Sequence, residues 1–170
     1  GGATTHCEIS GVTDYKSKDD KDCLTSIRNI MDKVGASNKA GFNRAEPAKP
    51  KTEEKELYSK IPYDRNKPYD VKEIINCLVD DSEFEEYKEL HGKTIVCGYA
   101  RIDGWAVGIV ANQRKLVKTK TGEMHFGGVI YSDSADKAAR FIMNCNQKKI
   151  PLVFLQDVTG FMVGSKSEHG

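Results

Sequence analysis

The sequence has little that would mark a membrane protein or a nucleic-acid-binding protein. No apolar stretch approaches the roughly 20 residues that a helix needs to cross a bilayer, and no secretory signal is recognisable. The 26 Lys and Arg residues are nearly balanced by 25 Asp and Glu residues, so the formal net charge is only +1. Nucleic-acid-binding domains usually gather a basic excess on one face. The composition therefore argues against nucleic acid and membrane insertion, and it is typical of a soluble domain.

Metal-binding and cofactor-binding patterns are also missing. The five cysteines are widely spaced, and no CxxC pair or Cys/His ligand spacing occurs, so we expect no structural zinc. Four of them have apolar neighbours, which is typical of small core residues in a reducing compartment. The four histidines show no HExxH spacing, and we expect them on the surface or in loops. Gly122, Gly127 and Gly128 form no phosphate-binding pattern and indicate a loop.

The first third of the chain predicts a loop, a helix and a linker. Residues 1–18 are polar and show no periodicity, so we expect a loop there. Apolar residues recur at helical spacing from about Asp19 to Val34, which predicts a helix with one apolar face. Residues 36–56 are rich in Lys, Ala, Pro and Glu, a composition typical of a linker between domains.

Two short helices are expected next. Asp70 and Glu73 form an Asp-x-x-Glu capping pattern before an apolar stretch, and Ser82–Glu85 repeats the pattern. A β-hairpin should follow, because the β-forming run Thr94–Ile102 ends at Asp103-Gly104, a dipeptide typical of a two-residue turn. The returning strand would run from Trp105, with Gly108 allowing a close backbone approach.

The last third predicts a helix followed by a strand. The helix spans about Ser134 to Lys148, and its apolar face comprises Ala135, Ala138, Phe141, Ile142 and Cys145. The run Leu152–Leu155 is apolar without alternation, which predicts a buried central strand with both faces covered. The order hairpin, helix, strand implies an α/β layer with a right-handed crossover.

The segment Gln156–Gly164 is the most suggestive of chemistry. It leaves the C-terminal end of the apolar strand, where open α/β sheets usually bind ligands. Gly160 and Gly164 permit a backbone that points N–H groups at an anion, and such groups can stabilise an oxyanion. The alternative is an ordinary strand-to-helix turn. The lysine-rich stretch Arg114–Lys120 is also open to two interpretations, contact with cofactor phosphates or, more commonly, a solvated hairpin.

Several segments resemble the carboxyltransferase (β) subunits of biotin-dependent acyl-CoA carboxylases, of the methylcrotonoyl-CoA and propionyl-CoA carboxylase type. The most specific are Ile150–Gln156 and Gly160–Gly164. Others are Asp70–Ile75, Asp81–Lys88, Val107–Asn112 and, near the start, Gly1-Gly2-Ala3, His6, Ser10-Gly11-Val12 and Asp14. We interpret the chain as an excerpt of a longer protein, because neither end looks like a natural terminus.

The resemblance implies an α/β fold of crotonase-like (ClpP/crotonase) ββα units, with an incomplete second carboxyltransferase domain. Residues 1–35 would be the C-terminal end of the first carboxyltransferase domain, and residues 36–68 a linker. Residues 69–170 would be the N-terminal part of the second domain.

The resemblance also implies a function, the transfer of a carboxyl group from carboxybiotin to an acyl-CoA thioester. A biotin carboxylase or biotin carrier subunit would be the partner, the subunits would form hexamers, and the location would be the bacterial cytoplasm or the mitochondrial matrix. The implied biotin-side loop comprises Gly160, Phe161, Met162, Val163 and Gly164, with Asn112 as a possible pocket residue. No catalytic side chain and no metal ligand is assigned.

Two alternatives stay open. One is a biotin-dependent acyl-CoA decarboxylase, which runs the same transfer toward biotin. The other is an inactive assembly fragment, because the glycine-rich segments that supply most oxyanion amides in the family would lie outside this chain. The stretch Arg114–His125 stands where methylcrotonoyl-type relatives have a shorter turn, which leaves the acyl group undecided.

Overall fold

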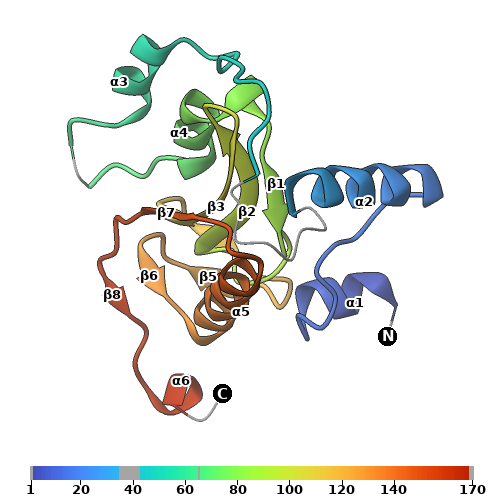
Figure 1. Ribbon diagram of the computed structural model, residues 1–170. Helices are drawn as coiled ribbons and strands as arrows, with labels where there is room; N and C mark the ends of the chain where they lie inside the picture. The colour runs from blue at the N-terminus through green and yellow to red at the C-terminus, as the bar shows by residue number, and fades with distance from the viewer. Residues whose placement is uncertain (1, 35–42, 65, 169–170) are drawn as a thin grey trace.

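The computed structural model describes residues 2–34, 43–64 and 66–168. Its centre is a four-stranded sheet in the order β1-β2-β3-β7. The strands are β1 (Glu85–Tyr87), β2 (Ile95–Ile102), β3 (Trp105–Asn112) and β7 (Leu152–Leu155). The first three are antiparallel, and β7 runs parallel to β3. Helices α4 (Val71–Leu78) and α5 (Ser132–Lys148) pack on opposite faces, giving the expected α/β layers (Figure 1).

The β2–β3 hairpin confirms the prediction from sequence. Asp103 and Gly104 have φ angles of 50° and 78°, the left-handed pair that a two-residue type I′ turn requires. Along β2, Cys97 belongs to the core cluster of α5, whereas Val96 and Ala100 belong to that of α4. Side chains alternate between the faces of a strand, so both faces of this hairpin are apolar and both are covered.

Helix α5 lies directly against Gly108 of β3. A Cβ on Gly108 would lie 2.6 Å from Cys145 Sγ and 3.2 Å from the Phe141 ring, so no side chain fits between helix and strand. The predicted apolar face is buried at Ala138, Phe141 and Cys145, whereas Ala135 is exposed. Burial raises the pKa of Cys145 to about 12, so this thiol stays protonated and packs as a small apolar group.

Only the first of the two predicted short helices forms. Helix α4 begins after Asp70, whose side chain accepts a hydrogen bond from the Lys72 N–H at 3.1 Å. The helix predicted after Ser82 is wrong. A short 3₁₀ turn, η2 (Asp80–Ser82), contains a residue with left-handed φ, Asp81, and the chain then enters β1, where Tyr87 pairs with Cys97 of β2. Cross-strand pairing therefore outweighs the local capping pattern.

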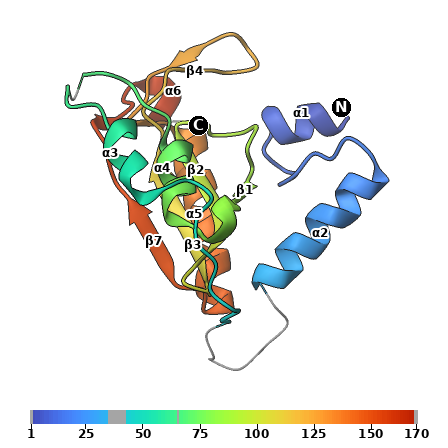
Figure 2. The ribbon, with the colours of Figure 1, turned by 90° about the horizontal axis from the view of Figure 1, so that it is seen from above.

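The N-terminal part differs from the prediction in two ways. Residues expected to form a loop include α1 (Ala3–Glu8), which is anchored by the buried side chain of Cys7. Helix α2 (Asp20–Val34) forms where expected, but its apolar residues Leu24, Ile27 and Met31 are about half exposed. Figure 2 shows the reason, since α1 and α2 lie beside the sheet and not across one of its faces.

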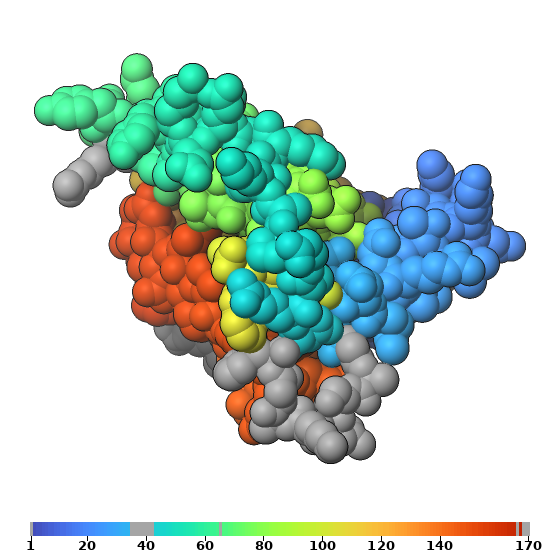
Figure 3. All heavy atoms as spheres, turned by 45° about the horizontal axis from the view of Figure 1, so that its top comes forward, coloured from blue at the N-terminus to red at the C-terminus, as the bar shows by residue number. Residues whose placement is uncertain are grey.

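The described part of the predicted linker is packed against the hairpin. The Ala45 N–H donates to the Gly104 carbonyl at 2.9 Å. Arg44 forms an ion pair with Asp103 at 3.0 Å and lies over the Trp105 ring. The segment continues through η1 (Glu54–Glu56) and α3 (Leu57–Lys60), and Figure 3 shows it (cyan) crossing the surface of the green and yellow elements. Residues 35–42 lie outside the described part, and the division of the chain at 36–68 stays a prediction.

Strand β7 is an edge strand within the described residues, because its only ladder partner there is β3. Val153 and Leu155 pack toward α4 and Leu152 toward α5, but the Phe154 side chain is 47% exposed. The prediction that Phe154 and Leu155 lie in a buried central strand is therefore wrong for this chain. No described helix or strand covers the outer side of β7, so the apolar run lacks the second neighbour that the pattern suggested.

The remaining elements are short. Strands β4 (Val117–Lys118) and β5 (Met124–His125) form the hairpin expected for the lysine-rich stretch. Its lysines are exposed, whereas Arg114 at its start is enclosed. Strand β6 (Val129–Ile130) precedes α5, and β8 (Gly160–Phe161) with α6 (Ser165–Glu168) follows β7.

Candidate functional site

The segment predicted to carry chemistry borders a pocket of about 590 Å³. Strand β8 pairs in parallel with β6, and this pairing places the following residues 162–164 in the pocket wall. Residues 123–126 of the hairpin and residues 131–133 at the start of α5 complete the lining. Three segments that are separate in sequence, namely the β4–β5 hairpin, the start of α5 and the segment after β7, therefore meet at one cavity.

Two stacked rings build the wall opposite the loop. The His125 and Tyr131 rings are 3.7 Å apart between centroids and nearly parallel, at 3°. The Tyr131 hydroxyl accepts the Phe126 N–H at 3.0 Å, and the Tyr131 N–H donates to Ser134 Oγ at 2.9 Å. These contacts hold the hairpin against the first turn of α5. His125, expected only on the surface or in a loop, is thus half-buried in strand β5 and lines the pocket.

Three residues of the predicted biotin-side loop line this pocket, namely Met162, Val163 and Gly164. Gly160 and Phe161 instead form β8, outside the lining, and the Phe161 side chain is 72% exposed. Gly164 has a φ of 124°, and a Cβ there would have no atom within 4 Å. The backbone at Gly164 is therefore open on the side where a side chain would stand.

Backbone hydrogen bonds fix the loop to its neighbours. The Thr159 N–H donates to the Gly128 carbonyl at 2.8 Å, and the Met162 N–H donates to the Ile130 carbonyl at 2.8 Å. Since both amides already have acceptors, an N–H group that the loop offers to an anion must come from another of its residues.

Asn112 holds the start of the segment that leads to the loop. It is 7% exposed at the end of β3, and its Oδ1 accepts the backbone N–H of Asp157 at 3.1 Å. Asn112 is not among the residues that line the pocket. Its contact instead fixes the place where the chain leaves β7.

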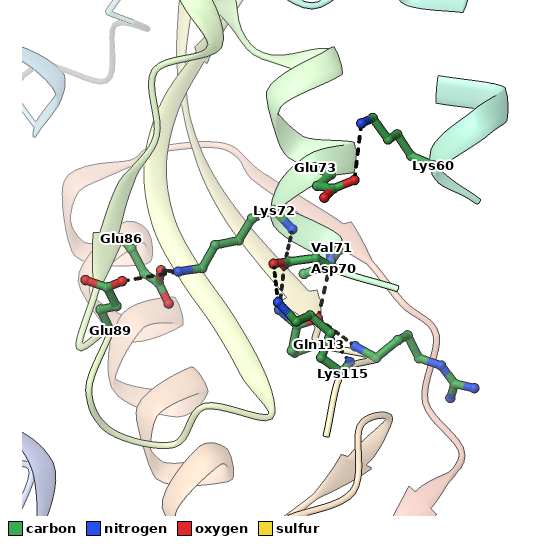
Figure 4. A network of polar contacts seen from close by, with 10 residues as sticks. Lys60, Asp70, Val71, Lys72, Glu73, Glu86, Glu89, Gln113 and Lys115 are labelled. Atoms are coloured by element: carbon green, nitrogen blue, oxygen red, sulfur yellow. Dashed lines mark hydrogen bonds and ion pairs between the residues drawn. The ribbon is translucent and has the colours of Figure 1, made fainter. Parts of the chain in front are cut away.

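Gln113 connects the end of β3 with the start of α4 (Figure 4). Its side chain is buried, and its Oε1 accepts the N–H groups of Arg114, Lys115 and Val71 at 2.9, 3.2 and 3.3 Å. Its Nε2 donates to Asp70 Oδ1 at 2.8 Å. A glutamine that follows a strand has no recognisable sequence signature, so sequence reasoning did not find this residue.

The hydrogen bonds around Asp70 favour its charged form. Burial opposes ionisation of the carboxyl group, but hydrogen bonds from Gln113 and Lys115 and from the Lys72 N–H outweigh burial and lower the pKa of Asp70 below its ordinary value. Lys115 Nζ lies 3.0 Å from the carboxylate. The charge of Asp70 is therefore matched by donors that come from both α4 and the exit of β3.

Asp70 should stabilise the protein in a pH-dependent way. We expect Asp70→Ala to lower the free energy of unfolding by about 1 to 2 kcal/mol near neutral pH, the usual cost of losing an N-cap. Asp70→Asn keeps the cap and loses only the charge, so it should cost less. Because the pKa is lowered in the folded state, the carboxylate stabilises the fold above its unfolded value of 3.8, and this contribution is lost as the pH falls through the folded pKa.

Denaturant titration of wild type and Asp70→Asn at several pH values checks this expectation. The difference between the two proteins should shrink below about pH 4. A difference that stays constant down to about pH 2 would show that the charge contributes nothing.

Other features of the described residues are less informative. A polar pocket of about 490 Å³, lined by residues 14–17 and residues of β1, contains none of the predicted site residues. No group of three or more His, Cys, Asp or Glu side chains in the described ranges could hold a metal ion. Of the helices described, none has the length and apolar character to span a membrane.

Comparison with known proteins identifies the family. The carboxyl transferase domain model matches residues 1–170. The chain is 43% identical to the biotin-dependent 3-methylcrotonyl-coenzyme A carboxylase beta1 subunit of Mycobacterium tuberculosis, covering 100% of this chain and 30% of that protein. It is 41% identical to the mitochondrial methylcrotonoyl-CoA carboxylase beta chain of Dictyostelium discoideum, covering 99% of this chain and 26% of that one.

Two further similarities are to a decarboxylase subunit and to a solved structure. The chain is 33% identical to the methylmalonyl-CoA decarboxylase subunit alpha of Veillonella parvula, covering 100% of this chain and 32% of that protein. A solved structure of the transcarboxylase 12S hexamer with hydrolysed methylmalonyl-coenzyme A bound superposes with a TM-score of 0.82 at 32% identity, covering 99% of this chain and 32% of that one.

The chain therefore spans about 30% of the length of such relatives, and the expected α/β, crotonase-like fold of a partial domain is confirmed. Because the family model matches the whole sequence, this chain belongs to the carboxyl transferase domain family.

Proposed function

We propose that this chain is part of a carboxyltransferase that moves a carboxyl group from carboxybiotin to an acyl-CoA. The observation that carries the proposal is the match of the carboxyl transferase domain model to all of residues 1–170. The pocket supports it, because the segment that follows β7 contributes residues 162–164 to its lining, and open α/β sheets usually bind ligands with the segments that follow their strands.

The pocket suits the biotin side of such a site. Its volume of about 590 Å³ lies within the usual range for small-molecule sites. Met162 and Val163 offer apolar surface, and the open backbone at Gly164 leaves room for a flat ring to approach. When bound, carboxybiotin supplies the carboxyl group that is transferred.

In this proposal the protein positions the carboxybiotin and excludes water from the site. The hydrogen bonds of Thr159 and Met162 fix the loop before any ligand arrives, so little order has to be gained on binding. No side-chain acid or base is required, because backbone N–H groups that meet the developing charge provide the main stabilisation. Those donors need not all come from this chain.

The proposal extends to partners. A biotin carboxylase or biotin carrier subunit would deliver the biotin, a coenzyme A thioester would be the acceptor, and the full-length subunits would form a homo-oligomer, a hexamer by family resemblance. Residues 1–35 would end the first carboxyltransferase domain and residues 69–170 would begin the second. The location would be the bacterial cytoplasm or the mitochondrial matrix.

A transfer assay tests the proposed function. The full-length protein, combined with its biotin-bearing subunit, should incorporate radioactive bicarbonate into 3-methylcrotonoyl-CoA or propionyl-CoA in an ATP-dependent reaction that avidin blocks. The isolated 170-residue chain should show no transfer above a no-protein control. Absence of avidin-sensitive incorporation with any acyl-CoA in a broad panel, by a correctly assembled protein, would refute the proposal.

A second candidate function is the reverse transfer, in a biotin-dependent decarboxylase. The 33% identity to a decarboxylase subunit supports this second function. Release of carbon dioxide from methylmalonyl-CoA in the presence of biotin, without ATP-dependent carboxylation of propionyl-CoA, would support this direction over the first.

A further inference from the structure

A guanidinium group is enclosed at the point where the chain leaves β3. The Arg114 side chain is only 13% exposed, and its Nε lies 3.3 Å from a carboxylate oxygen of Asp157, which follows β7. Burying a charge is costly unless it is paired. The enclosed Arg114 is paired with the half-exposed Asp157, so the ion pair joins the segments that follow β3 and β7, whereas Lys115, Lys118 and Lys120 are exposed.

The two adjacent glycines of this region make room for Arg114. A Cβ on Gly127 would clash with the Arg114 main chain, and a Cβ on Gly128 would clash with the Arg114 guanidinium and lie 3.1 Å from Thr159 Oγ1. Gly127 and Gly128, which as sequence indicate only a loop, thus both lie in close contact with Arg114, Gly127 against its main chain and Gly128 against its guanidinium. The guanidinium lies between the segment before β6 and the segment after β7.

Asp157 is held from three directions. Besides Arg114, its carboxylate accepts a hydrogen bond from the Tyr69 hydroxyl at 2.8 Å, and its N–H donates to Asn112 Oδ1 at 3.1 Å. Burial, followed by the hydrogen bond to Asp157, raises the pKa of Tyr69 to about 12. The phenol therefore stays protonated as a donor over the physiological range.

These contacts act on the loop that lines the pocket. Asp157 opens the segment that runs through Thr159 to residues 162–164 in the pocket wall. Thr159 is bonded to the Gly128 carbonyl, beside the guanidinium. A shift of Asp157 would therefore displace the few residues that follow it, including residues 162–164 in the pocket wall.

We infer that Arg114 is a positioning residue, which holds the pocket loop in its binding geometry through Asp157. The inference rests on the proposed function in assigning that loop to carboxybiotin. Arg114 is not among the residues that line the pocket, so its loss should act through the loop, affecting the biotin side of the reaction and leaving the acyl-CoA side unchanged. Its planar fork also suits the enclosed site better than an ammonium group does.

The test compares four variants of the full-length protein assembled with its biotin-bearing subunit: Arg114→Met, Arg114→Lys, Asp157→Asn and Lys118→Met. The last is the matched control, because Lys118 is an exposed cation on the same hairpin. Bicarbonate incorporation into 3-methylcrotonoyl-CoA and propionyl-CoA is measured while the carrier and the acyl-CoA are varied separately. Hydrogen exchange is followed in peptides that cover residues 157–164.

Arg114→Met and Asp157→Asn should lower transfer at limiting carrier roughly tenfold to a hundredfold, as expected for a small misplacement of a binding group. The KM for acyl-CoA should stay within about twofold, and Arg114→Lys should restore part of the activity. Exchange at residues 157–164 should accelerate in the two impaired variants and not in Lys118→Met.

The inference is overturned if both impaired variants match Lys118→Met in exchange and in carrier dependence. It is also overturned if they raise the KM for acyl-CoA and for the carrier equally, because that result means general damage. If Arg114→Met does not fold, the nearly isosteric Asp157→Asn decides the outcome. If wild type transfers no carboxyl group, the proposed function fails, and the exchange measurement still decides whether Arg114 holds the loop.

Discussion

Replacing Phe141 with alanine should lower the free energy of unfolding by about 3 to 5 kcal/mol, the usual cost of truncating a buried aromatic residue. The Phe141 side chain is fully buried. Its ring centroid lies 5.4 Å from that of Tyr87 and 4.9 Å from that of Tyr99, so it joins α5 to both β1 and β2. The truncated side chain would leave a cavity between the helix and the sheet that the surrounding layers could not readily fill.

Tyr63→Ala is the control for Phe141→Ala, because the Tyr63 side chain is fully exposed and its loss should change stability by less than about 0.5 kcal/mol. Denaturant titration of both variants gives the comparison. A loss below about 1 kcal/mol for Phe141→Ala would contradict the role of this residue as the centre of the α5 core.

Gly164→Val should reduce carboxyl transfer by about a hundredfold, an effect comparable to losing one oxyanion donor. Two features of Gly164 support this expectation. Its φ of 124° disfavours any side chain, and its Cβ position faces open space in a residue that lines the pocket. A valine there would both strain the backbone and occupy the space proposed for the biotin ring. Acyl-CoA binding should change little.

The chain contains a matched control for the backbone strain. Gly122, at the tip of the β4–β5 hairpin, also has positive φ, at 88°, and also has no atom within 4 Å of its Cβ position. Gly122→Val should therefore carry a similar local strain, at a residue that is not itself part of the pocket lining. Transfer rate and melting temperature are measured on the same preparations. Equal rates per folded protein for the two variants would show that Gly164 only eases a turn.

Local sequence signals predicted the central part of the fold well. The turn at Asp103-Gly104 and the cap at Asp70 are signals that depend on a few adjacent residues, and both the hairpin and α4 form as expected. The face of α5 was predictable because its period of 3.6 residues is visible in the sequence. The site proposed after β7 rested on the apolar strand that precedes it, and residues 162–164 of that segment line the pocket.

The features that were not predicted from the sequence depend on contacts between residues that are distant in the chain. Lys137 belongs by its charge on the surface of α5, yet it is 1% exposed. Burial lowers its pKa, and the carboxylate of Glu86 in β1, 3.9 Å away, partly offsets this effect. Glu86 in turn pairs with Lys72 of α4 (Figure 4). Glu86 and Lys72 are both distant from Lys137 in the sequence. The burial of this lysine is therefore explained only by the packing of α5, β1 and α4 in the folded protein.

The residues of the candidate site likewise fall into those with a local sequence signal and those that depend on contacts between distant residues. Met162, Val163 and Gly164 could be proposed from sequence because they follow a recognisable strand and a specific motif. Arg114 and Asp157 could not, since their pairing joins two strand exits that are far apart in the chain. A charged residue in a basic stretch is usually solvated, and the enclosed arginine becomes visible only with the glycines that make room for it.

The edge position of β7 has a consequence for handling the isolated chain. Its four residues, Leu152–Leu155, contain no charge and no proline, and among the described residues only β3 hydrogen-bonds to it. The outer side therefore carries a row of unused backbone donors and acceptors beside the half-exposed Phe154 ring. Such an edge is a template for adding a strand from another polypeptide. The isolated chain thus exposes an aggregation-prone surface, and the same backbone row would allow another strand to extend the sheet.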